Sequence, residues 1–122
     1  MLNQTADRGR CGEEAAEQWL RRNGFEICAR NWRNGHYEID LIARKWDALH
    51  FVEVKTRRAD GLTTPEEAIT PQKFRSLSHA ATTYLTQHPT NLEPQFDLAA
   101  IDVHPDGTFT VRFIENAMEY NW

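Results

Sequence analysis

One stretch, YEIDLIARKWDALHFVEVKTR at residues 37–57, constrains the fold more than any other part of the chain. Its residues alternate between apolar and polar at 37–44 and again at 49–56, and residues two apart in a strand share a face. The pattern predicts two half-buried strands joined by a tight turn near Trp46 and Asp47, an antiparallel hairpin. The apolar side chains expected on one face are those of Ile39, Leu41, Ala43, Val52 and Val54.

The opposite face of this hairpin carries Glu38, Asp40, Glu53 and Lys55. A turn centred on Asp47 or just before it places Asp40 opposite Glu53 or its neighbour. Directly opposed side chains have Cβ atoms about 5 Å apart, and two carboxylates at that distance repel by roughly 3 kcal/mol at an effective dielectric of about 20. Because one lysine cannot neutralise three acids, the face predicts a bound cation.

A hard divalent ion, Mg²⁺ or Mn²⁺, suits these groups, since Mg²⁺ prefers a few carboxylates, a carbonyl and retained waters. The predicted ligands are the carboxylates of Asp40 and Glu53 and the carbonyl of Val54. Lys55 would lie beside the metal-bound water, able to orient or activate it against a phosphodiester. The alternative is a solvated face on which Glu53 and Lys55 form an ordinary surface pair.

Three further charged residues are candidates. Apolar spacing predicts a helix over 12–23, ended by Gly24, and Glu13 at the edge of its apolar stripe is either a further acid of the metal site or a solvated side chain. Lys73 is a candidate phosphate contact, with a surface lysine as the alternative. Asp97 is expected to be structural.

The remaining pattern predicts one α/β domain over residues 1–122. Its order is a helix, three strands, a helix and two strands. The further elements predicted are a strand at 25–32, a turn at Asn34-Gly35, a polar loop at 57–64, a helical turn from Thr64-Pro65 capped by Glu67, a helix from Thr70-Pro71 and strands at 96–103 and 109–115.

The charge distribution restricts what the chain can bind. A net charge of −4 argues against a non-specific polycation, but the basic residues are bunched in the first two thirds of the chain. A nucleic acid would therefore bind there, and the candidate phosphate contacts are Arg8, Arg10, Arg57, Arg58 and Lys73.

The composition also sets expectations about the compartment. No stretch is apolar enough to cross a bilayer, and the N-terminal residues lack the apolar core of a signal peptide. A soluble, cytoplasmic protein with reduced Cys11 and Cys28 and no membrane partner is expected. The five histidines show no zinc-ligand spacing.

The residues of the charged face also carry a family resemblance. Asp40 followed by Glu53-Val54-Lys55 resembles the PD-(D/E)XK nuclease signature, and the surroundings resemble the YraN family of small bacterial proteins. The matching pieces are GEEAA (12–16), LRRNGFEICARNWR (20–33), EIDLIA (38–43), FVEVKTR (51–57), PEEAITPQK (65–73), FDLAAI (96–101) and FIENA (113–117).

The resemblance implies a restriction-endonuclease-like three-layer α/β fold, similar to archaeal Holliday junction resolvases, with a mixed central sheet of about five strands flanked by helices. It also implies a nuclease triad, a helix-borne acid and an associated acid. Carried over, these are Asp40, Glu53 and Lys55, then Glu13 and Glu38. The chain departs from the family at Tyr37, where the family usually has glycine, and the larger side chain is expected to narrow access near Glu38.

Three functions remain open from the sequence. The first is a metal-dependent endonuclease that hydrolyses DNA, rather than RNA, at branched or damaged positions. The second is a nucleic-acid-binding module of the same fold with little or no catalysis. The third is a purely structural or protein-interaction role, and a homodimer is compatible with each.

Overall fold

The computed structural model describes residues 4–61 and 69–117, with side chains from Cys11 onward within those ranges. The elements in chain order are α1 (Gln4–Arg22), β1 (Glu26–Asn34), β2 (Tyr37–Lys45), β3 (Ala48–Arg58), α2 (Pro71–Gln87), β4 (Glu93–Val103) and β5 (Phe109–Ile114). The predicted order of helix, three strands, helix and two strands is confirmed. The helical turn predicted at Thr64-Pro65, with Glu67, lies outside the described residues.

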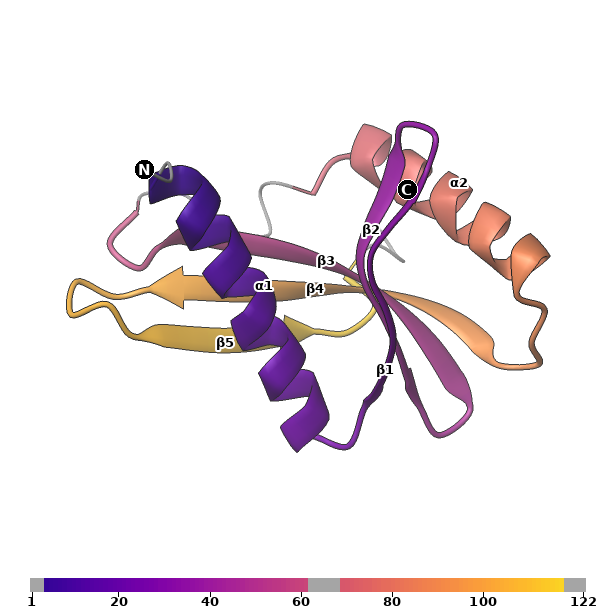
Figure 1. Ribbon diagram of the computed structural model, residues 1–122, viewed down its shortest axis with the longest axis horizontal. Helices are drawn as coiled ribbons and strands as arrows, with labels where there is room; N and C mark the ends of the chain where they lie inside the picture. Colours follow the sequence, from indigo (N-terminus) through magenta and orange to yellow (C-terminus); the bar gives the residue numbers. More distant parts are fainter. Residues whose placement is uncertain (1–3, 62–68, 118–122) are drawn as a thin grey trace.

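The strands form one five-stranded sheet in the order β1-β2-β3-β4-β5, which Figure 1 shows as a strongly twisted surface. β3 and β4 pair in parallel, whereas the other neighbours are antiparallel. A parallel pair needs a long crossover connection, and α2 lies in that connection. The mixed central sheet implied by the resemblance is therefore confirmed.

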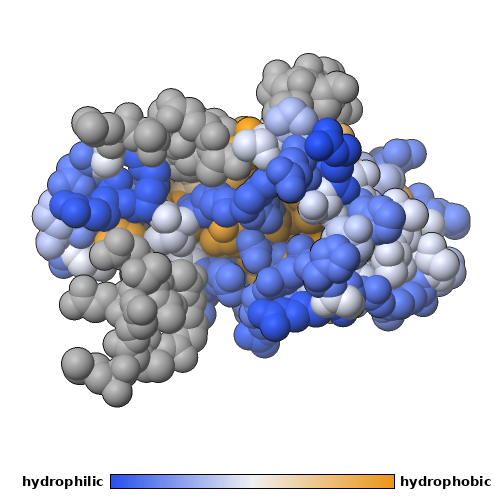
Figure 2. All heavy atoms as spheres, turned by 90° about the horizontal axis from the view of Figure 1, so that it is seen from above, coloured by the Kyte–Doolittle hydropathy of each residue, from blue (hydrophilic) through white to orange (hydrophobic). Residues whose placement is uncertain are grey.

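A helix packs on each face of this sheet. On one face α1 buries Leu20 in a core with Leu41, and on the other α2 buries Leu77 in a core with Ile42. Because consecutive strand residues point to opposite faces, Leu41 and Ile42 separate two cores, and the three-layer α/β fold is confirmed. Seen from above, hydrophobic atoms show mainly in a central hollow of a largely hydrophilic face (Figure 2).

Neither helix in the described ranges is long and apolar enough to cross a bilayer.

The β2–β3 hairpin has the predicted register. Trp46, with a left-handed φ of 54°, lies in the turn, and paired residues run as far as Leu41 with Val52. The same register continued by one residue places Asp40 opposite Glu53.

β2 changes direction at Asp40. Ile39 packs in the core on the α2 side, whereas Leu41 and Ala43 pack on the α1 side, so the prediction that all three share one face is wrong for Ile39. The register of β1 places Asn31 opposite Asp40, and Asn31 has a left-handed φ of 50°. Figure 1 shows the outer part of the β1–β2 hairpin turned toward α2.

Two predicted boundaries were wrong. Arg57 and Arg58, expected in the polar loop, belong to β3 and pair along β4. The strand continues because a distant segment supplies its hydrogen-bonding partner, which local polarity does not reveal. Similarly, α1 begins at Gln4, well before the predicted Gly12.

Asp97 is fully buried and structural, as predicted. Its carboxylate accepts hydrogen bonds from the Gln95 side chain at 3.0 Å and the Asn116 amide at 2.9 Å, and it pairs with the buried ring of His50. Asp97 therefore connects β3, β4 and the segment after β5 through the hydrogen bonds of its buried carboxylate.

Candidate functional site

Asp40 lies where β2 and β3 stop pairing. The Val54 amide donates a hydrogen bond of 2.8 Å to Oδ2 of Asp40, so a side-chain oxygen takes the place that a strand carbonyl would have in the ladder. This bond holds the carboxylate against the main chain of β3. The structure thus brings together Asp40, Glu53 and Val54.

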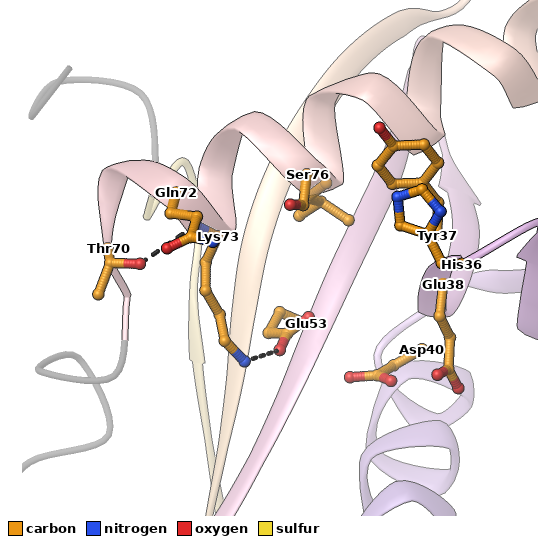
Figure 3. A pocket seen from close by; sticks show the side chains of 10 residues that line it. His36, Tyr37, Glu38, Asp40, Glu53, Thr70, Gln72, Lys73 and Ser76 are labelled. Carbon is orange, nitrogen blue, oxygen red and sulfur yellow. Dashed lines mark hydrogen bonds and ion pairs between the residues drawn. The ribbon is translucent and has the colours of Figure 1, made fainter.

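Glu53 is the meeting point of two lysines. Its Oε1 lies 3.3 Å from Nζ of Lys55, two residues along β3, and 3.4 Å from Nζ of Lys73. Figure 3 shows Lys73 reaching down from α2 to this oxygen. The position of Lys73 follows from the helix start, because Oγ1 of Thr70 accepts a hydrogen bond of 3.1 Å from the Lys73 amide and caps α2.

The carboxyl group of Asp40 is the most perturbed acid of the site. Burial, reinforced by the repulsion of Glu53 and then of Glu13 and Glu38, raises its pKa from 3.8 to about 7, even though the Val54 hydrogen bond lowers it. Both lysines pair with Glu53 and not with Asp40. Asp40 attracts the charge of Lys73 but forms no ion pair with either lysine, and a cation bound at Asp40 would lower the cost of ionising it.

The two lysines differ in how readily they lose a proton. Burial lowers the pKa of Lys55, and the neighbouring Lys73 lowers it further. The pKa of Lys73 is raised, because its side chain can hydrogen-bond to Lys55 and is attracted by Glu53. Lys55 is thus the member of the pair better suited to accept a proton near neutral pH.

Glu13 and Glu38 flank Asp40 from two sides. Glu13, on α1, lines a cavity that also reaches Asp40, and burial followed by repulsion from Glu38 and Glu53 raises its pKa against the opposing effect of Asn31. Glu38 lies 3.5 Å from Arg33 and lines the cavity on the α2 side. The other three predicted acids are therefore gathered around Asp40.

The larger of these cavities has a volume of about 530 Å³ and lies between α2 and the start of β2. Glu38, Asp40 and Glu53 lie along one side of it, as Figure 3 shows. The opposite side comes from α2 and is polar, with Thr70, Gln72, Lys73 and Ser76. A volume of this size is in the range of roughly 300–1,000 Å³ that is usual for small-ligand sites.

These residues fit a hard divalent ion better than other metals. Within the described ranges, no three or more His, Cys, Asp or Glu side chains form a metal cage by themselves. An ion at Asp40 would depend on two carboxylates, the carbonyl of Val54 and water, which is the pattern of Mg²⁺ and not of zinc. The raised pKa of Asp40 favours such an ion, because burial and the neighbouring carboxylates disfavour the charged form that a cation would stabilise.

The predicted phosphate contacts are distributed less compactly. Nε of Arg57 lies 3.5 Å from Asp102 on β4, and Arg58 lies 3.2 Å from Asp60. Arg8 and Arg10 belong to α1, but their side chains lie outside the described part of the chain. Of the three predicted phosphate contacts whose side chains the structure describes, Lys73 alone lies in the group around Glu53.

Sequence reasoning missed three residues that line the larger cavity. They are His36, Gln72 and Ser76. A signal for His36 was available, because His36 and Tyr37 form an aromatic pair directly before the acidic strand. No comparable signal marked Gln72 and Ser76, since their place depends on how α2 packs.

Comparisons with known proteins agree with the sequence pattern. Residues 12–101 match the uncharacterised protein family UPF0102, a range that contains every matching piece except the closing FIENA. A UPF0102 protein of Symbiobacterium thermophilum is 44% identical over 110 residues, covering 89% of this chain and 93% of the relative. A UPF0102 protein of Bacteroides fragilis is 38% identical over 109 residues, covering 89% of each. The chain therefore belongs to the uncharacterised protein family UPF0102, the YraN family of the resemblance.

Proposed function

We propose that this protein is a Mg²⁺- or Mn²⁺-dependent endonuclease that hydrolyses DNA phosphodiester bonds at branched or damaged positions. The observation that carries the proposal is Asp40, a half-buried carboxyl group with a pKa of about 7 that lies beside a second carboxylate and two amino groups. Acids with a pKa raised in this way cluster at functional sites because their charged form needs a partner.

Three groups would hold the metal: the carboxylates of Asp40 and Glu53 and the carbonyl of Val54. The ion would supply charge stabilisation at the phosphate and a more acidic water. Lys55, with its lowered pKa, would orient that water and accept its proton. Lys73 would neutralise charge on the phosphate, because its ammonium group lies at the rim between Glu53 and α2.

The backbone of DNA would be held by the basic residues of the earlier part of the chain. Arg57 and Arg58 at the end of β3, and Arg8 and Arg10 on α1, are the proposed phosphate contacts. Such contacts position the duplex without reading its sequence. In the free protein Nε of Arg57 lies 3.5 Å from Asp102. Arg57 would therefore have to share its guanidinium group between Asp102 and a phosphate.

Purified protein incubated with duplex, flap and four-way-junction DNA in Mn²⁺ tests the proposal. Cleavage is expected for at least one substrate, and an Asp40→Ala, Glu53→Ala double variant is expected to lose it. Asp47→Asn, in the exposed turn at the other end of the hairpin, is the matched control and should cleave normally. Cleavage that survives the double variant would point to a contaminating nuclease and sink the proposal.

A second candidate is a DNA-binding module of the same fold without catalysis. It is favoured by the ion pairs of Glu53, because Lys55 and Lys73 occupy the oxygen that a metal would need. Calorimetric titration with Mn²⁺ separates the two candidates. Salt-dependent DNA binding with no heat from the metal and no cleavage would favour the binding module.

A further inference from the structure

The cavity between α2 and β2 extends well beyond the acids of the proposed metal site. Its far end is formed by His36 and Tyr37, and Tyr37 precedes Asp40 by three strand positions, or about 10 Å. This distance is close to the reach of one nucleotide from its phosphate to the edge of its base. A phosphate at Asp40 would therefore place the attached base inside the cavity.

Aromatic rings make up this far end. The ring of Tyr37 stacks on His79 of α2 at 4.7 Å and 25°, and it lies 4.3 Å from the ring of His36. The stack with His79 ties Tyr37, at the start of β2, to α2 beside this cavity. His36 is exposed and offers a flat surface at the end of this group.

Charge decides which part of a nucleotide the cavity can accept. Glu38, Asp40 and Glu53 lie along one side, with Lys73 as the one cation among the described lining residues. A phosphate near Glu38, away from the proposed ion at Asp40 and Glu53, would be repelled, whereas a base carries no charge. The amide of Gln72 and the hydroxyl of Ser76 are suited to the donor and acceptor groups on the edge of a base.

We infer that this cavity receives one unpaired nucleobase, stacked on the exposed ring of His36, which Tyr37 supports from the other side, next to the phosphodiester that is cut. The inference rests on the proposed nuclease function and narrows its substrate to DNA with an unpaired or displaced nucleotide. A fully paired duplex is a poorer substrate, because a base must first leave the stack, which costs a few kcal/mol.

Fluorescence of 2-aminopurine tests base entry without any cleavage. Two duplexes are compared in EDTA, one with a single unpaired 2-aminopurine and one with an abasic residue at the same position. We expect at least about fivefold tighter binding of the duplex with the base, the low end of stacking on aromatic side chains, and a change in 2-aminopurine emission. His36→Ala and Tyr37→Ala should reduce both effects.

Two variants keep this test interpretable. His36 is exposed, so His36→Ala should fold even if Tyr37→Ala does not. Trp46→Ala is the control, because Trp46 is an aromatic residue that is 86% exposed in the turn at the other end of β2. It should keep the preference for the duplex with the base.

The same duplexes in Mn²⁺ distinguish failure of the base site from failure of the nuclease. Equal binding and equal cleavage of the two duplexes, with unchanged emission, overturns the base site and leaves the nuclease standing. Base-dependent binding without cleavage overturns the nuclease and leaves the base site standing. Absence of binding to either duplex overturns the base site as well.

Discussion

The amide of Val54 donates a 2.8 Å hydrogen bond to Oδ2 of Asp40, and this bond joins two strands at the point where their ladder ends. It fixes an acid whose burial works against its ionisation. Folding therefore favours the protonated form of Asp40, whereas the proposed metal binding needs the carboxylate. Ionising Asp40 lowers the free energy of unfolding of the metal-free protein.

Asp40→Asn is expected to stabilise the metal-free protein at high pH. The folded-state pKa of about 7 lies above the ordinary value of 3.8, so the folded state binds more protons across that interval and the free energy of unfolding falls as pH rises through it. The amide can still accept the Val54 hydrogen bond without carrying charge. Urea denaturation in EDTA at pH 8 should show a gain of up to about 4 kcal/mol, one pKa unit corresponding to about 1.4 kcal/mol.

The gain from Asp40→Asn should disappear near pH 4, where the wild-type carboxyl group is protonated when folded. Asp47→Asn, on the exposed turn, is the control and should not alter the pH dependence. If Asp40→Asn is less stable than wild type at pH 8, the charged carboxylate of Asp40 must already be stabilised by its surroundings in the folded protein, contrary to this prediction.

Binding of Mn²⁺ is expected to weaken as pH falls below about 7, the pKa of Asp40. Below this value the metal must displace a proton, so the apparent affinity should fall by about tenfold per pH unit, and above it the affinity should level off. Calorimetric titrations in buffers of different ionisation enthalpy would measure the released proton. An affinity that is the same at pH 5.5 and 8 would exclude Asp40 as a ligand.

The two lysines at Glu53 should have separable effects on kcat and on KM for DNA. Lys55→Met is expected to lower kcat by about 10²–10⁴, the usual contribution of a general base, and to strengthen Mn²⁺ binding, because its Nζ lies 3.3 Å from the Glu53 oxygen. Lys73→Met removes a competitor for Glu53 and should strengthen Mn²⁺ binding while raising KM for DNA. Arg75→Met, an exposed cation on the same helix, is the control, and equal loss of kcat in all three variants would contradict these roles.

α1 lies close against β3 at Gly12. A Cβ at this position would overlap Oγ1 of Thr56 and lie 3.1 Å from its Cβ. Gly12→Ala should therefore destabilise the protein by about 1–3 kcal/mol, the cost of overpacking, less up to about 1 kcal/mol gained from better helix propensity. Urea denaturation would measure the difference.

A double variant tests the cause of that loss. Thr56→Ala removes the hydroxyl that the new methyl group would meet, so Gly12→Ala should cost less in that background than in wild type. Strictly additive effects would place the cause elsewhere. Because Glu13 follows Gly12 directly, Gly12→Ala should also reduce cleavage. The reduction should be smaller in the Thr56→Ala background.

The hairpin could be predicted because its information is local. Period-two alternation identified the strands, and a short turn at Trp46 and Asp47 set the register that places Asp40 opposite Glu53. The helix starting at Thr70-Pro71 was equally local, since one hydroxyl and one proline define its first turn.

The rest of the site depends on contacts between distant segments. The bend at Asp40, which moves Ile39 to the other core, coincides with the left-handed Asn31 in a neighbouring strand. The pairing of Lys73 with Glu53 requires α2 to return over the sheet. The His50–Asp97 pair joins residues 47 positions apart. The sequence around either residue gives no indication that the two are in contact.

The sheet order also has a consequence for how the protein folds. β1, β2 and β3 form an antiparallel meander of neighbouring segments, whereas β4 can join only after the chain has closed a long loop through α2. Local pairings form faster than distant ones, so Asp40 and Glu53 are expected to meet before Lys73 arrives. During synthesis, the nascent chain would expose an acidic hairpin in which Lys55 is the sole lysine paired with Glu53 until Lys73 of α2 has emerged.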